Sequence, residues 1–189
     1  MYQPRLEFHH ARRAAAYVAG VLYEATHERS YLDQALRLVR WADSHLHNGV
    51  SGLYGRNTSD GTTMDYVQGM MIGAELELCH ATLDQRYCRE AERVGAASLA
   101  TFPSQLDWSA TADGLYLRFL LDLYHEDGNP RWYRAAIANA NHARVRAASG
   151  DGLYLRGWNG ETIPGGRLRT HAGTVALFAW VAAAQAHHA

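Results

Sequence analysis

Apolar residues recur at three- and four-residue steps along most of the chain, which is the spacing of one face of an α-helix. In the stretch 30–46 one face carries Leu32, Ala35, Leu36, Val39, Ala42 and Leu46. In the stretch 169–187 an alanine-rich face stands opposite a second apolar face, so this helix is expected to be buried on both sides. The pattern predicts seven helices, at 6–25, 30–46, 63–82, 84–102, 109–127, 129–147 and 169–187. Extended backbone is expected in short pieces near Leu53-Tyr54 and at 153–155.

Three segments of the chain share one internal pattern, in which an aromatic residue follows eight positions after the first residue. Each joins the end of one helix to the start of the next through a short polar connection. Tandem repetition of this kind is typical of helical-hairpin architectures. We therefore predict an all-α fold with three αα-hairpins and a seventh, unpaired helix, in a single domain spanning 1–189. The three segments are 23–31, 79–87 and 124–132.

The connections between hairpins are long, at about 47–62, 103–108 and 148–168, whereas those within hairpins are short. In tandem-hairpin folds the long loops emerge at one end, which is where a site would be built. This end is rich in aromatic and acidic residues, which suits sugar rings and their hydroxyl groups. The alternative is that the aromatics pack loops onto helices and the acids cap helix ends. The residues are Trp41, Tyr54, Trp108, Tyr116, Tyr154, Trp158, Asp60, Asp65, Asp107, Asp113, Asp151 and Glu161.

The amino-acid composition limits the classes of partner that the chain is expected to bind. Aromatics number 20 of 189 residues, and the net charge of −1 offers no electrostatic footprint for nucleic acid or anionic membrane. Apolar runs fall short of a membrane span and the start lacks a secretory leader, so the chain as written is expected to be cytoplasmic. Cys79 and Cys88 are expected to be structural thiols, with a bridge across one hairpin as the alternative. Neither a cofactor nor a metal is expected.

Glycosidic bond hydrolysis usually requires two carboxyl groups facing one substrate. Consecutive aspartates do not occur in this chain, and the adjacent pair Glu126-Asp127 falls in a short connection at the other end. Glu75 and Glu77 diverge by about 200° around their helix and cannot face one substrate. A pair drawn from different hairpins, such as Asp65 with Asp113, stays open.

The segment 63–74, Thr-Met-Asp-Tyr-Val-Gln-Gly-Met-Met-Ile-Gly-Ala, resembles the Tyr-Asn-Gln-Gly-containing helix start of glycoside hydrolase family 76. This family comprises endo-α-1,6-mannanases, which are (α/α)6 barrels of six hairpins. Val67 stands where the family has asparagine. Segments 112–118 and 171–177 are similar to later helices of the family, and the hairpin links are similar to its recurrent turns.

The resemblance covers the C-terminal half of the family or slightly more, so it implies a partial (α/α)6 toroid of about seven helices. In the family the catalytic pair is two consecutive aspartates on an earlier hairpin, and the resemblance therefore implies a mannan-type cleft without assignable catalytic residues. A complete relative would work with retention of configuration. The sugar contacts that the resemblance and the loop chemistry suggest are Asp65, Tyr66, Gln68, Trp108, Tyr116, Trp41 and Tyr54.

Two other functions stay open. Sugar epimerases and unsaturated-glycuronyl hydrolases are six-hairpin enzymes with similar links, and a helical-repeat scaffold could bind a protein partner through a concave face. The last helix also predicts self-association. Without neighbouring hairpins its large apolar side chains would lie in water, and a two-fold homodimer would cover them. The alternative is that the 169–187 helix folds back across the 6–25 helix and closes a small ring. These side chains are Leu177, Phe178, Trp180 and Val181.

Overall fold

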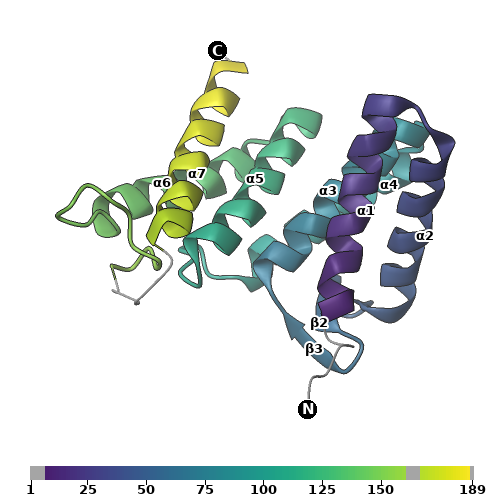
Figure 1. Cartoon of the computed structure of the whole chain (residues 1–189), viewed down its shortest axis with the longest axis horizontal. Helices are drawn as coiled ribbons and strands as arrows, with labels where there is room; N and C mark the ends of the chain where they lie inside the picture. Colours follow the sequence, from purple (N-terminus) through teal and green to yellow (C-terminus); the bar gives the residue numbers. More distant parts are fainter. Residues whose placement is uncertain (1–6, 161–166, 188–189) are drawn as a thin grey trace. The chain divides into compact units, whose positions relative to one another are not determined.

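The structure, a computed structural model, describes residues 7–160 and 167–187 and contains seven helices in these ranges (Figure 1). All seven lie within two residues of the limits predicted from the sequence. The all-α hairpin fold is therefore confirmed. The helices are α1 (Glu7–Thr26), α2 (Arg29–His45), α3 (Asp65–Thr82), α4 (Gln85–Thr101), α5 (Ala110–Asp127), α6 (Pro130–Arg146) and α7 (Arg167–His187).

The chain divides into two compact units, Met1–Ala100 and Thr101–Ala189. The single-domain organisation stays a prediction. Within the described ranges, no helix combines the length and the apolar character that a membrane crossing needs.

The repeat predicted from the sequence reappears as a repeated link geometry. The fifth residue of each segment, His27, Leu83 or Gly128, has a left-handed backbone with φ of 57°, 58° and 67°. Its N–H donates to the carbonyl of the segment's first residue, at 2.7, 2.8 and 3.0 Å respectively. This bond closes the helix end in the manner of a left-handed C-cap. The N–H of the aromatic ninth residue donates to the carbonyl three residues earlier in all three links.

In the first unit, α1 packs against both α2 and α3. The approach of α1 to α3 depends on Gly20, because a Cβ atom at this position would lie 2.4 Å from the Cβ of Glu77. A small antiparallel sheet in the order β1-β2-β3 closes the long loop after α2. Only β2 was expected in part, near Leu53-Tyr54. The strands are β1 (His47–Asn48), β2 (Leu53–Asn57) and β3 (Asp60–Thr63).

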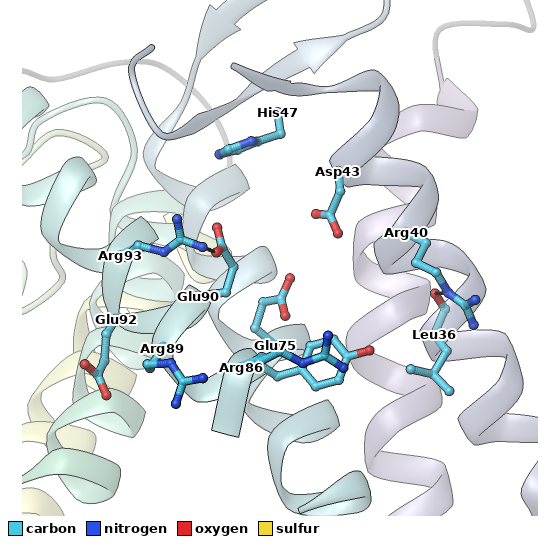
Figure 2. Close-up of a pocket in the computed structure, with 11 residues that line it drawn as sticks. Leu36, Arg40, Asp43, His47, Glu75, Arg86, Arg89, Glu90, Glu92 and Arg93 are labelled. Carbon is cyan, nitrogen blue, oxygen red and sulfur yellow. Dashed lines mark hydrogen bonds and ion pairs between the residues drawn. The ribbon is translucent and has the colours of Figure 1, made fainter. Parts of the chain in front are cut away.

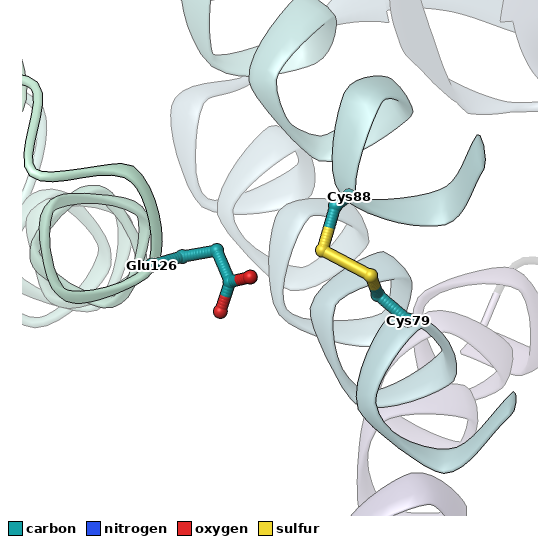
Figure 3. Close-up of side chains that lie close together, drawn as sticks. All are labelled: Cys79, Cys88 and Glu126. Atoms are coloured by element: carbon teal, nitrogen blue, oxygen red, sulfur yellow. A yellow bond between two sulfur atoms is a disulfide. The ribbon is translucent and has the colours of Figure 1, made fainter. Parts of the chain in front are cut away.

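The α3–α4 hairpin is crosslinked by a disulfide between Cys79 and Cys88, whose Cα atoms lie 5.4 Å apart (Figure 3). The prediction of two free structural thiols is therefore wrong. The left-handed turn at Leu83 brings the last turn of α3 beside the first turn of α4. Residues nine apart in sequence thus meet across the link.

In the second unit, α7 packs against α5 and α6. Glycine allows α5 and α7 to approach closely, because a Cβ atom at Gly173 would lie 2.9 Å from the carbonyl oxygen of Ala110. Trp132, the aromatic of the third link, is completely buried, and its indole N–H donates to Asp127 at 2.9 Å.

The apolar face expected to be exposed on α7 is largely occupied within the second unit. Leu177 and Val181 are 0% and 4% exposed. Phe178 packs edge-on against Tyr154, and the guanidinium of Arg118 lies 5.5 Å from the Trp180 ring centroid. The premise of the predicted homodimer, that a single chain leaves all four side chains uncovered, is therefore wrong, because α5 and α6 already cover part of this face. The homodimer stays a prediction.

Candidate functional site

The start of α3 is fixed to the sheet by the side-chain amide of Gln68. Its Oε1 accepts the main-chain N–H of Tyr54 at 2.8 Å, and its Nε2 donates to the carbonyls of Tyr54 and Met64 at 2.9 and 3.0 Å. Gln68 is completely buried and Tyr54 is 1% exposed. Hydrogen bonds between these two predicted site residues thus hold the start of α3 against β2. A sugar contact by Gln68 stays a prediction.

Asp65 and Tyr66 form the first turn of α3. Asp65 is nearly buried and accepts the N–H of Tyr66 at 2.7 Å. Tyr66 is half-buried, and burial raises the pKa of its hydroxyl. The charges of Arg56 and Arg13 act against this increase in pKa. Tyr66 therefore offers an aromatic face and a neutral hydroxyl beside cationic groups.

Trp41 on α2 is half-buried and already has two side chains against its ring. The imidazole of His45 stacks at 4.9 Å between centroids, and the Arg12 guanidinium lies 4.2 Å from the ring centroid. A sugar ring would have to displace one of these neighbours to stack on Trp41.

Arg13 was missed by sequence reasoning. It is 1% exposed, and its Nη2 donates to the carbonyls of Gly55 and Arg56 at 2.9 and 2.6 Å. Burial lowers the pKa of its guanidinium to about 10. Arg13 joins α1 to β2 through these hydrogen bonds. The signal in the sequence that could have identified it is a charged residue within an alanine-rich helix.

In the second unit, the start of α5 presents Trp108. Asp113 accepts the main-chain N–H groups of Trp108 and Ser109 at 3.0 Å each, which satisfies two donors at the helix start. This hydrogen bonding confirms a capping role for Asp113. Trp108 is 50% exposed, whereas Tyr116 is 1% exposed and packs edge-on against Phe102. Of the two predicted aromatics on this helix start, Trp108 is the one with accessible surface.

The loop before α7 is held by hydrogen bonds to Asp107, which precedes α5, and to Thr174 of α7. Asp107 accepts the N–H of Asn159 at 2.9 Å, and the buried Trp158 donates its indole N–H to Thr174 at 3.0 Å. Trp158 is therefore a packing residue. Glu161 lies outside the described residues.

A groove of about 1150 Å³ opens in the first unit between α2 and α4, with α3 at its floor (Figure 2). Sequence reasoning did not identify it. Charged residues of both signs dominate its lining, and all of them come from the first unit. The lining residues are Leu36, Arg40, Asp43, His47, Glu75, Arg86, Tyr87, Arg89, Glu90, Glu92 and Arg93.

Glu75 and Asp43 are the acids at the centre of this groove. Glu75 is 1% exposed, and its Oε2 has no hydrogen-bond partner in the described part of the chain. Burial raises the pKa of the Glu75 carboxyl to about 8, with a further increase from Asp43 and an opposing effect of Arg93. Burial also raises the pKa of Asp43, which accepts the Tyr54 hydroxyl at 2.6 Å. A carboxyl in the apolar run from Met70 to Leu76 was the overlooked signal.

Comparison with known proteins identifies the fold. No family model matches the chain, and no curated protein sequence does. A family 76 α-mannanase of Bacteroides thetaiotaomicron matches with a TM-score of 0.75 and 26% identity, over 93% of this chain and 52% of that one. The family 76 α-1,6-mannanase of Salegentibacter sp. matches with a TM-score of 0.74 and 22% identity, over 88% and 56%.

The Salegentibacter enzyme has also been solved as an inactive variant, with two consecutive aspartates changed to asparagine, in complex with α-1,6-mannotriose. A family 88 glycosyl hydrolase of Bacteroides vulgatus matches with a TM-score of 0.66 and 14% identity, over 90% of this chain and 59% of that one. The chain spans about half the length of the family 76 structures that it matches. It therefore has part of the six-hairpin fold of the family 76 α-mannanases.

Proposed function

We propose that this chain is a carbohydrate-binding part of an α-mannanase-like toroid, which recognises α-1,6-linked mannose at the loop-bearing helix starts. The observation that carries the proposal is the match to a family 76 α-mannanase over 93% of the chain at 26% identity. The complex of a related enzyme with α-1,6-mannotriose supports the choice of sugar. Tyr66 in the first unit and Trp108 in the second are the contacts we favour, each as a contact within its own unit, since both have accessible aromatic surface.

The other predicted contacts are proposed either to bind the sugar less directly or to hold the site in shape. Asp65 would accept a sugar hydroxyl beside Tyr66, and Trp41 would stack after displacing a neighbour. Gln68, Tyr54 and Tyr116 would act by holding the loop end in shape, because each is almost completely buried. A protein-binding scaffold is the alternative function, and it would leave Trp108 unaffected by mannosides.

Sugar binding is expected to be weak, in the millimolar range, or about −4 kcal/mol, because the chain spans half of the related fold. A titration with α-1,6-mannotetraose should shift the indole N–H signal of Trp108 in an NMR spectrum. Trp132 and Trp158 provide internal controls, since both are buried and their indole groups donate to Asp127 and Thr174. Equal shifts of all indole signals, or none at tens of millimolar sugar, would remove the sugar proposal.

Hydrolysis of α-1,6-mannan is expected to be undetectable. The chain has no consecutive aspartates, and loss of one catalytic carboxylate alone costs several kcal/mol of transition-state stabilisation. Reducing-sugar release from unbranched α-1,6-mannan measures this. Release that disappears in Asp65→Asn or Asp113→Asn would reveal a replacement pair. Asparagine can still accept the N–H bonds that Asp113 receives, so this variant should keep its fold.

We also propose that the chain works in an oxidising compartment. The bridge between Cys79 and Cys88 supports this, because disulfides persist in secreted and periplasmic proteins and are rare in the cytosol. A cytoplasmic location, in which the two cysteines would be reduced, is the competing proposal.

A further inference from the structure

We propose that the groove between α2 and α4 binds a small sugar-sized oxyanion, held between Arg40 and Arg89 and contacting the Glu75 carboxyl at the floor. This site is separate from the mannoside contacts and does not depend on them. A volume of about 1150 Å³ accommodates a monosaccharide or disaccharide that carries a phosphate or carboxylate.

The basic side chains of the groove come from two facing helices. Arg40 lies on α2, and Arg89 lies on α4 with two further arginines. Figure 2 shows Glu75 between Arg40 on one side and Arg89 on the other. Arg40 donates its Nε–H to the Leu36 carbonyl at 3.1 Å, so its guanidinium lies beside Leu36 on α2 and points away from Glu75 (Figure 2). A ligand would draw this exposed side chain toward the groove. Guanidinium groups on opposite walls suit the several oxygens of one oxyanion.

The remaining arginines of α4 are engaged in ion pairs within the protein. Arg93 pairs with Glu90, and Arg86 pairs with Asp84 at 2.6 Å. These pairs neutralise two of the four positive charges that line the groove. The positive charges left for a ligand are therefore those of Arg40 and Arg89, one on each wall, and the acids beside them are Asp43 and Glu92.

The buried carboxyl of Glu75 points to a ligand independently of the arginines. A buried polar atom without a partner is costly, and Oε2 of Glu75 is such an atom. In its neutral form the carboxyl can donate a hydrogen bond to an anion oxygen. A cationic ligand would instead meet the guanidinium groups of Arg40 and Arg89 that are not paired within the groove, with Asp43 and Glu92 as its acidic neighbours. Asp43 is less available, because it already accepts the Tyr54 hydroxyl.

The charge state of Glu75 makes anion binding depend on pH. Its pKa of about 8 lies above the ordinary value of 4.5, so the carboxyl is mostly neutral at pH 7 and becomes an anion above pH 8. The ionised form would repel a bound oxyanion, and affinity should fall as the pH rises through 8. The charged and titratable groups facing it are Asp43 and Arg40 from α2, His47 and Tyr54 from the sheet, and Arg86, Tyr87, Arg89, Glu90, Glu92 and Arg93 from α4.

Calorimetric titration at pH 7 with inorganic phosphate, glucose 6-phosphate, glucuronate and neutral glucose tests the proposal. Binding of at least one of the three anions, with none of glucose, is expected. Glucose 6-phosphate and glucuronate distinguish a site that prefers a phosphate group from one that prefers a carboxylate group. Arg40→Gln and Arg89→Gln should each weaken binding at least about tenfold, which is the order expected for a charge-assisted hydrogen bond. Arg37→Gln, one turn earlier on α2 and outside the groove, is the matched control and should bind as the unmodified chain does.

A Glu75→Gln variant tests the carboxyl itself. It should bind the anion at pH 7 and lose the decrease in affinity above pH 8. Thermal unfolding gives a second readout that needs no ligand. Because the folded pKa of Glu75 exceeds 4.5, the folded state holds this proton more tightly, and its contribution to stability should decline between pH 4.5 and about 8. The variant should not show that decline.

Three results would overturn the proposal. The first is that none of the three anions binds at a ligand concentration of about 10 mM. This concentration is about ten times a dissociation constant of roughly 1 mM, the weakest affinity expected of a built site. The second is equal affinity in the Arg40→Gln, Arg89→Gln and Arg37→Gln chains. The third is the same pH dependence of binding in Glu75→Gln as in the unmodified chain.

Discussion

Replacement of Gln68 by alanine is expected to lower the free energy of unfolding by about 3 kcal/mol. The side chain makes three hydrogen bonds to main-chain groups in a completely buried place. Its removal loses these bonds and leaves the N–H and carbonyl of Tyr54 without partners, at about 1–3 kcal/mol for each unsatisfied group. Urea unfolding should show a midpoint lower by about 1.5 M for a denaturant slope near 2 kcal/mol per M.

Gln85→Ala is the matched control, because Gln85 is exposed at the start of α4. Its effect should stay within about 0.5 kcal/mol, as for most surface substitutions. If Gln68→Ala left stability unchanged but reduced mannoside affinity, Gln68 would be a sugar contact and its structural role would be refuted.

Reduction of the Cys79–Cys88 disulfide is expected to lower the free energy of unfolding by about 2.7 kcal/mol. This value follows from the entropy that closure of a ten-residue loop removes from the unfolded chain at 25 °C. The same loss is expected for a chain carrying Cys79→Ser and Cys88→Ser. Urea unfolding with and without a reductant measures both.

The double variant is also the control for the reductant, which should have no effect on it. Titration of free thiols in the unfolded, unreduced protein checks the premise. Two reactive thiols per chain would show that the bridge is absent and that the sequence expectation of free cysteines was right.

The helices could be predicted from the sequence because the residues at each end determine where a helix begins and ends. In all three hairpin links a residue with a left-handed backbone follows one helix, and an aromatic is the third residue of the next. Such links repeat at similar spacing, so one pattern locates several boundaries. Strand β3 has no such signal, since Asp60–Thr63 is polar and pairs with β2 only after the turn at Thr58-Ser59 brings the two together.

The candidate site was harder to predict because exposure depends on packing between helices. Trp108 and Tyr116 both fit a sugar cleft by residue type, yet one is 50% exposed and the other 1%. Glu75 illustrates the opposite error. The angle between Glu75 and Glu77 around α3 correctly placed them on different sides of that helix. The groove that Glu75 lines has its walls on α2 and α4, however, and no single segment of the sequence indicates that these two helices face each other across it.

The disulfide also has a consequence for biosynthesis. The chain contains two cysteines, and these allow a single intramolecular pairing. Oxidation can therefore produce no mispaired isomer within one chain, in contrast to proteins with four cysteines, for which three connectivities compete. A cell that exports this chain needs an oxidant to form the bridge, and it needs no isomerase to correct it.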